Sequence, residues 1–324
     1  MQKLNFRWAI TQAIDEEMAR DEDVFVIGED VAASGGSFGL TRGLLDKYGE
    51  MRVRDTPVSE EAIVGLGVGA AAVGLKPIVE IMFMDFIYLA MDQIINHAAK
   101  MRYMYGGQVS IPIVIRTLAG GGFRTGMHHS QSIESMFGQV PGLKVVYPST
   151  PADAKGLLKS AIRDPDPVIF LEQKTLMSLK EEVTDEEILV PIGKGKIVRE
   201  GTDITVVALG LCVHQALRVA TQLKDKVSVE IIDPRTVVPL DKELIKQSVK
   251  KTSRLIIIHE AYAPFGFGSE VAAIIAEESL YELEAPIKRV TSKFYPLPVG
   301  TNEDYILPSD EALIRAIEHA MKGE

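Results

Sequence analysis

Residues 145–162, VVYPSTPADAKGLLKSAI, join a short apolar strand to a helix with a clear start signal. Thr150 can cap the helix, Pro151 suits its first position, and Asp153 stands where a capping box has an acidic residue. Similar apolar strands alternate with helical patterns along nearly the whole chain. Because these strands are continuously apolar rather than alternating, we expect parallel sheets that are covered by helices on both faces.

The first half of the chain repeats this order of strand and helix. A helix is predicted from Phe6 onwards, where apolar residues recur at spacings of three and four. The other elements expected here are strands at 24–27, 78–82, 113–115 and 145–147, and helices around 60–74, 86–104 and 151–163. Between residues 172 and 203, paired acids and a GKGK stretch interrupt the alternation of strands and helices. This interruption indicates a linker and a crossing strand.

A second α/β unit follows this interruption. Its expected strands are 204–208, 227–232, 255–259 and 287–290, and its expected helices lie near 213–224, 241–251, 267–282 and 310–321. The sequence therefore predicts two α/β domains with mainly parallel sheets, over residues 1–185 and 186–324.

The composition is that of an ordinary globular protein, with 324 residues, 46% hydrophobic and 25% charged. Lys and Arg number 35 against 45 Asp and Glu, and the net charge of −10 argues against a general nucleic-acid binder. The single cysteine, Cys212, excludes internal disulfides and any cysteine-based zinc site. No apolar run approaches the ~20 residues of a membrane-spanning helix, and the acids at 15–17 do not fit a signal peptide. We expect a soluble protein of a reducing compartment, the cytoplasm.

A glycine-rich segment, Gly65 to Ala70, fits the dinucleotide fingerprint G-x-G-x-x-G/A. That fingerprint must follow a strand and open a helix, whereas here Ser59 looks like the cap of a helix that has already begun. Glu60 and Glu61 in the first turn would also repel a pyrophosphate. Glycine costs roughly 1 kcal/mol relative to alanine inside a helix, so we expect close backbone packing to compensate.

A second glycine run, Gly120-Gly121-Gly122, follows a predicted strand and precedes His128 and His129. One interpretation is a flexible loop with solvated histidines. The other is a backbone that approaches a ligand closely, beside an imidazole that titrates near neutral pH. Ligand sites in parallel sheets lie beyond the carboxyl ends of strands, which favours the second interpretation. No further ligand pattern accompanies the histidines, so a metal site is disfavoured.

Two acids also stand at element ends, Glu29 after the first strand and Glu60 at a helix start. Acids at helix starts commonly only complement the helix dipole. A carboxyl group packed among apolar neighbours can instead hold a proton for donation. These alternatives stay open. Aromatic residues such as Phe83, Phe86 and Tyr88 are more often part of a core than a platform for a cofactor. With no phosphate-binding loop and no G-x-S-x-G elbow, the residues alone indicate a two-domain α/β protein with a candidate site near 120–130.

Five longer strings resemble one family. They are GEDVAASGGSFGLTRGL (28–44), RDTPVSEEAIVGLGVGAAAVGLKPIVEIMF (54–83), MDQIINHAAKMRYMYGG (91–107), HSQSIESMFGQVPGLKVVYPSTPADAKGLLKSAIRDPDPVIFLE (129–172) and IDPRTVVPLD (232–241). The strings are similar to the beta subunit of the thiamine-diphosphate-dependent decarboxylating component of 2-oxo acid dehydrogenase complexes. They resemble the pyruvate and acetoin dehydrogenase members more than the branched-chain members, and 91–107 together with HSQS leans towards acetoin.

The resemblance implies a pyrimidine-binding α/β domain at 1–185 and a transketolase C-terminal-type α/β domain at 186–324. Thiamine-diphosphate enzymes hold the diphosphate and Mg²⁺ through a G-D-G…N motif, and no GDG occurs in this chain. In the family that half of the site belongs to the alpha subunit. The resemblance therefore implies a half-site here, with thiamine diphosphate shared between alpha and beta subunits.

The resemblance also implies roles for single residues. Glu60 stands where the family has the glutamate that hydrogen-bonds N1′ of the aminopyrimidine, and Phe86 stands at the aromatic position that packs on this ring. Glu29 resembles an acid on the pyrimidine side of the site. His129 matches the family's active-site histidine, whose expected role is proton transfer or orientation during acylation of a lipoyl group. His128 has no clear counterpart.

A structural potassium ion is a further implication, because five positions match those that supply oxygens to it in some members. They are Ile113, Ala161, Ile162, Asp164 and Asp166. Mammalian members have Asn where this chain has Asp166, a change to which a main-chain carbonyl ligand is insensitive. Sites rich in carbonyl oxygens suit hard cations.

The assembly implied is an alpha₂beta₂ heterotetramer that passes an acyl group to the lipoyl domain of a dihydrolipoyl acyltransferase. The family's C-terminal domain docks on the basic subunit-binding domain of that acyltransferase, which suits an acidic chain. Three alternatives stay open: a branched-chain 2-oxo acid dehydrogenase beta subunit, a non-catalytic scaffold subunit, and a lone NAD-binding dehydrogenase.

Overall fold

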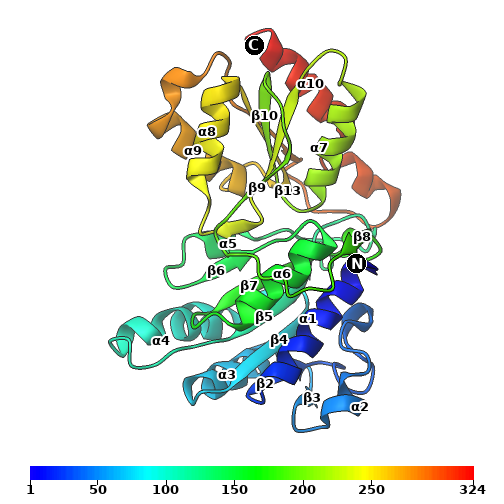
Figure 1. Ribbon diagram of the computed structural model, residues 1–324, viewed down its shortest axis with the longest axis vertical. Helices are drawn as coiled ribbons and strands as arrows, with labels where there is room; N and C mark the ends of the chain where they lie inside the picture. The colour runs from blue at the N-terminus through cyan, green and yellow to red at the C-terminus, as the bar shows by residue number, and fades with distance from the viewer. The chain divides into compact units, whose positions relative to one another are not determined.

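The computed structural model describes residues 1–324 and divides into two compact units. The first unit contains residues 1–119 and 136–192, and the second contains residues 120–135 and 193–324. Both units are built from a mainly parallel sheet with helices (Figure 1). The predicted two-domain α/β fold is confirmed.

Within the first unit, the sheet has the strand order β6-β7-β5-β4-β2-β3, and every neighbouring pair is parallel. Its strands are β2 (Val24–Gly28), β3 (Val53–Asp55), β4 (Lys76–Phe83), β5 (Val114–Ala119), β6 (Lys144–Val146) and β7 (Val168–Gln173). β1 (Gln2–Asn5) and β8 (Lys180–Val183) form a separate antiparallel pair. The four predicted strands are confirmed, whereas β3 and β7 were not predicted.

The helices of the first part of the chain follow the apolar patterns. They are α1 (Phe6–Arg20), α2 (Leu44–Tyr48), α3 (Glu60–Ala72), α4 (Ala99–Met104), α5 (Ser135–Gly138) and α6 (Pro151–Ile162). Thr150 caps α6, because its hydroxyl accepts a hydrogen bond from the Asp153 amide at 3.2 Å. Ser59 takes the N-cap position of α3, as predicted, although its side chain makes no capping hydrogen bond.

The single helix expected at 86–104 is instead three consecutive segments. A 3₁₀ helix, η2 (Met84–Ala90), and a π-helical segment, η3 (Gln93–Ala98), precede α4. In η2 the buried residues Met84, Ile87 and Ala90 recur every third position. This spacing matches the three residues per turn of a 3₁₀ helix, so the apolar pattern itself explains the tighter winding.

The glycine-rich segment lies inside α3, as predicted, and does not open a helix after a strand. Gly67 faces the sheet of its own unit. A Cβ atom built on Gly67 would lie 2.7 Å from Val79 Cγ2 and 2.9 Å from Ile113 Cδ1. Close packing of the α3 backbone on β4 therefore explains this glycine, without a nucleotide.

The second unit is a five-stranded sheet of order β14-β13-β10-β11-β9, in which only β9 is antiparallel to its neighbour. The strands are β9 (Lys196–Arg199), β10 (Ile204–Ala208), β11 (Val229–Asp233), β13 (Leu255–Tyr262) and β14 (Lys288–Ser292), with a short β12 (Thr236–Val238) elsewhere in the unit. The helices are α7 (Leu211–Gln222), α8 (Lys242–Thr252), α9 (Phe267–Glu278) and α10 (Asp310–Met321). In Figure 1, α7 and α10 cover one face of this sheet, and α8 and α9 cover the other.

Short 3₁₀ turns complete the fold: η1 (Ser37–Gly39), η4 (Lys174–Leu176), η5 (Leu280–Glu282) and η6 (Gly300–Tyr305). None of the helices has both the length and the apolar character that crossing a membrane requires.

The packing of Gly67 leads to a first prediction. Gly67→Ala should lower the free energy of unfolding by about 1–3 kcal/mol, because a methyl group there overpacks the α3–β4 contact. Gly69 is the matched control, since a Cβ on it would meet nothing within 4 Å. Gly69→Ala should stabilise the chain by up to about 1 kcal/mol through helix propensity. Chemical denaturation of the purified chain measures both, and equal stability of the two variants would contradict the packing argument.

Candidate functional site

Two candidate acids lie close together at the carboxyl end of β2. Glu29 follows the last residue of β2, and Glu60 is the first residue of α3, at the positive end of that helix. The Thr56 amide donates a hydrogen bond of 3.0 Å to the Gly28 carbonyl, which ties these two segments together. Burial raises the pKa of Glu29, and the negative charges of Glu60 and Asp30 raise it further. The structure thus brings the two acids into electrostatic contact.

Glu60 is the more shielded member of this pair. It is only 7% exposed, whereas the next residue of the same turn, Glu61, is exposed. A pocket of about 610 Å³ is lined in part by Thr56 and Pro57, which shortly precede Glu60 in the chain; Glu60 itself is not among its lining residues. The Thr56 hydroxyl is buried and has no hydrogen-bond partner. A polar ligand atom could satisfy such a hydroxyl, because buried polar groups are costly when unpaired.

Phe86 lies in η2, directly after β4, and its ring is partly buried. It meets Phe83 edge to face, with ring centroids 6.0 Å apart and planes at 88°. The ammonium group of buried Lys174 stands 5.5 Å from the centroid of Phe83. Phe86 is therefore one side of an aromatic pair at the carboxyl end of β4, not an isolated core residue.

A buried ion network lies beneath these residues, and the sequence analysis missed it. Arg116 of β5 is fully buried and donates to Glu172 of β7 at 2.7 and 3.1 Å and to Glu80 of β4 at 3.1 Å. Glu80 also accepts a hydrogen bond of 2.8 Å from the Ser37 amide. The loop that follows Glu29 is thereby tied to the centre of the sheet. Charged residues inside otherwise apolar strands were the available signal.

The five residues matched to a potassium site lie together at the opposite, amino-terminal edge of this sheet. Ile113 precedes β5, and residues 161–166 join the end of α6 to the start of β7. The Val168 amide donates to the Ile113 carbonyl at 2.9 Å. Lys144 Nζ lies 2.6 Å from Asp164 Oδ1 and 3.3 Å from Asp166 Oδ2, so these carboxylates already face a cation. Main-chain carbonyls are the oxygens that remain for a metal ion.

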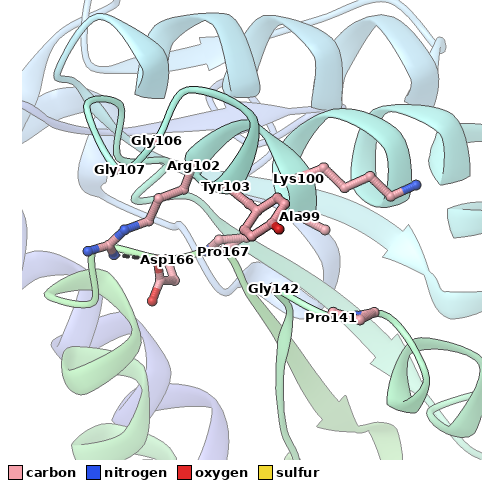
Figure 2. A pocket seen from close by; sticks show the side chains of 10 residues that line it. All are labelled: Ala99, Lys100, Arg102, Tyr103, Gly106, Gly107, Pro141, Gly142, Asp166 and Pro167. Atoms are coloured by element: carbon pink, nitrogen blue, oxygen red, sulfur yellow. Dashed lines mark hydrogen bonds and ion pairs between the residues drawn. The ribbon is translucent and has the colours of Figure 1, made fainter.

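Figure 2 shows a pocket of about 600 Å³ at the same amino-terminal edge. Its walls are α4 with the Gly106-Gly107 turn, the turn at Pro141 and Gly142, and the segment Asp166-Pro167. Arg102 Nη1 lies 2.5 Å from Asp166 Oδ1 across this pocket (Figure 2). Glu29 and Glu60 lie at the carboxyl end of β2, on the edge where parallel sheets commonly bind ligands. The pocket lies at the opposite edge and is therefore separate from their site.

His129 belongs to the second unit, in the loop formed by residues 120–135. His129 is partly buried, and His128 is exposed. The His129 amide donates to the Gly126 carbonyl at 3.1 Å, and the Gly120 amide donates to the Gln131 carbonyl at 3.0 Å. These two backbone hydrogen bonds fold the loop back on itself.

Two family models match the chain. The model described as the transketolase pyrimidine-binding domain matches residues 2–180, and the model described as the transketolase C-terminal domain matches residues 193–313. A solved structure of a split-gene transketolase, an inactive beta4 tetramer, shares the fold with a TM-score of 0.81, and the alignment covers 99% of each chain. Its sequence identity is 24%.

Several curated proteins are similar over almost their whole length. The beta subunit of 2-oxoisovalerate dehydrogenase from Bacillus subtilis is 48% identical, over 98% of each chain. The beta subunit of pyruvate dehydrogenase E1 component from Acholeplasma laidlawii is 46% identical, over 97% of each chain. The beta subunit of acetoin:2,6-dichlorophenolindophenol oxidoreductase from Cupriavidus necator is 44% identical, over 99% of this chain and 98% of its own.

The pairing of the two acids is open to a direct test. Glu60→Gln removes one of the negative charges that act on Glu29, so the pKa of Glu29 should fall towards its usual range. Carbon-13 NMR titration of the Glu29 carboxyl measures this shift. Glu61→Gln is the control, because it removes an exposed carboxylate from the same turn and should leave the titration unchanged. An unchanged Glu29 in Glu60→Gln would mean that the two carboxyls do not interact.

Proposed function

The chain belongs to the transketolase-like family of beta subunits of pyruvate, acetoin and 2-oxoisovalerate dehydrogenases, and we propose that it supplies half of a thiamine-diphosphate site shared with an alpha subunit. The observation that carries this proposal is the shielded Glu60 beside Glu29 at the carboxyl end of β2. We assign the pyrimidine-binding domain to residues 1–185 and the C-terminal domain to residues 186–324.

The residues of the first unit fit an aminopyrimidine ring. Glu60 is buried and can share a proton with a ring nitrogen, in our assignment N1′. Phe86 offers an aromatic face or edge against which a flat ring can pack. Glu29, whose pKa is raised by burial and by the charge of Glu60, adds a second acid to this side of the proposed ring site. When bound, thiamine diphosphate supplies a thiazolium that serves as the electron sink for decarboxylation or C–C cleavage.

An alpha subunit is needed to complete this site, because the chain has no GDG sequence to hold the diphosphate and Mg²⁺. We propose an alpha₂beta₂ heterotetramer that hands its acyl group to the lipoyl domain of a dihydrolipoyl acyltransferase. His129 is assigned to proton transfer or orientation in that acyl transfer. The acidic chain suits contact with the basic subunit-binding domain of the same acyltransferase.

Pyruvate or acetoin is the proposed substrate, and a branched-chain 2-oxo acid is the second candidate. Relatives of all three kinds are 44–48% identical to this chain, so overall similarity does not separate them. Part of the substrate pocket comes from the alpha subunit in our proposal. Co-purification of the native chain, with mass spectrometry of partners present in equal amount, should recover a subunit with a GDG…N sequence. Recovery of the chain alone and without bound cofactor would contradict the half-site.

The proposed role of Glu60 predicts that replacing it slows the chemical step and leaves assembly of the subunits intact. In the assembled heterotetramer, Glu60→Gln should slow exchange of the thiazolium C2 proton by at least about a hundredfold, because acid–base help of this kind is worth 10²–10⁴. Assembly with the alpha subunit should be unchanged. Proton NMR of exchange in deuterated buffer measures the rate, and Glu61→Gln is the control. Normal exchange in Glu60→Gln would favour the non-catalytic scaffold subunit.

We also propose that the main-chain carbonyls near Ile113 and residues 161–166 can hold a potassium ion, since the neighbouring carboxylates are engaged by Lys144 and Arg102. Binding to the folded state alone raises stability by mass action. Replacing Na⁺ by K⁺ at constant ionic strength should therefore raise the midpoint of thermal unfolding. Equal midpoints in the two salts would remove potassium from the proposal.

A further inference from the structure

Three buried or half-buried carboxyl groups lie within or beside the loop of residues 120–135, which carries His129 in the second unit. They belong to Glu134, to Glu260 of β13 and to Glu303 of η6. Glu134 is 1% exposed and Glu303 is fully buried. Burial, together with a smaller contribution from the charge of Glu260, raises the pKa of Glu134 to about 7. None of the three has a role in the function proposed above.

Glu303 and Glu260 hold the backbone of the glycine run. Glu303 Oε2 accepts hydrogen bonds from the amides of Gly122 at 3.1 Å and Arg124 at 2.8 Å. Glu260 Oε2 accepts one from the Gly121 amide at 3.2 Å. Hydrogen bonds to a carboxylate are roughly twice as strong as those between neutral groups. Three amides within four residues of the loop backbone are thus held by two carboxylates.

The segment Val299–Leu307, which contains Glu303, also packs closely on the same loop. A Cβ on Gly121 would lie 3.0 Å from both methyl groups of Leu307, and a Cβ on Gly126 would lie 2.7 Å from Val299 Cγ2. The Gly300 amide donates to the Arg124 carbonyl at 3.1 Å. The close approach of this segment is therefore enough to explain the glycines at 121 and 126, without a ligand.

The carboxylate of Glu303 is satisfied on one side only. Its Oε2 atom accepts from two loop amides, whereas its Oε1 atom is buried and has no hydrogen-bond partner, and the same holds for Glu134 Oε2. An unpaired buried oxygen costs stability, and an apolar side chain would avoid that cost only by leaving the two amides without their acceptor. What an apolar side chain lacks is the power to orient the Gly122 and Arg124 amides.

We propose that Glu303 is a positioning residue that fixes the loop of residues 120–130 and thereby sets the orientation of His129 for acyl transfer. The path is short: Glu303 holds Arg124, the next residue Thr125 donates its hydroxyl to the His129 carbonyl at 3.4 Å, and Gly126 accepts from the His129 amide. The inference rests on the proposed function, because it assumes that His129 acts in acylation of the lipoyl group.

The experiment compares two half-reactions of the assembled heterotetramer. Decarboxylation or cleavage is followed with an artificial electron acceptor, and acyl transfer is followed on an isolated lipoyl domain by mass spectrometry. Glu303→Leu should lower acyl transfer by about tenfold to a hundredfold, since small misplacements of a reacting group cost that much. The half-reaction with the artificial acceptor should stay within about twofold, as His129 is assigned to acyl transfer only.

Further variants separate positioning from folding. Glu303→Gln keeps an oxygen acceptor for the two amides and should retain most of the acyl transfer. Glu303→Asp keeps the negative charge but moves it away from the two amides. It should therefore show the selective loss of acyl transfer even if Glu303→Leu does not fold. Asp304→Asn is the matched control. It removes the exposed ion pair between Asp304 and the Arg124 side chain, at 2.8 Å, and leaves the amide contacts in place. Its acyl transfer should equal that of the unmodified enzyme.

The double variant His129→Ala with Glu303→Asp completes the test. If Glu303 acts through His129, the double variant should transfer acyl groups no more slowly than His129→Ala alone. Additive losses, or equal losses in both half-reactions of Glu303→Asp, would overturn the positioning role and leave the proposed function intact. Normal acyl transfer in His129→Ala would overturn both the role of His129 and this inference.

Discussion

A buried guanidinium at the centre of the first sheet is the constraint on which the candidate site depends. Arg116 spans β4, β5 and β7 through Glu80 and Glu172, and all three side chains are almost completely buried. Removing one partner would leave an uncompensated buried charge, which costs on the order of several kcal/mol. Burial raises the pKa of Glu172 to about 7, while the neighbouring Arg116 opposes the rise. Because Glu80 also holds the Ser37 amide, the same network fixes the loop behind Glu29.

Buried carboxyls do two different things in the two units. In the first unit, burial and the negative charge of Glu60 raise the pKa of the partly buried Glu29. In the second unit, Glu303 faces backbone amides instead and holds a loop through hydrogen bonds. Both arrangements use the low dielectric of the interior, where an interaction with a carboxylate is stronger than in water.

Most helices and strands could be predicted because each depends on the spacing of apolar residues within a short stretch of sequence. The strands at 204–208 and 255–259 and the helix at 310–321 are found where the pattern indicates. The cap at Thr150 is likewise local. β7 was missed because its run VIFLEQ lies where acids and lysines begin to dominate the neighbouring sequence. The stretch predicted as one helix at 86–104 divides into 3₁₀, π and α segments, which a single helical pattern does not distinguish.

The order of residues along the chain is enough to indicate parallel α/β sheets, to disfavour a nucleotide site in a helix that has already begun, and to point to Glu29, Glu60 and the loop near 120–130. Each of these conclusions depends on neighbours within a few turns of the chain, whereas Phe86 and His129 were selected through the resemblance to a known family. Folding alone decides that Glu29 and Glu60 repel each other, that Lys144 faces Asp164 and Asp166, and that Glu303 holds Gly122 and Arg124. Charge repulsion, burial and directed hydrogen bonds act across space between residues far apart in sequence, and no local pattern records which of them will meet.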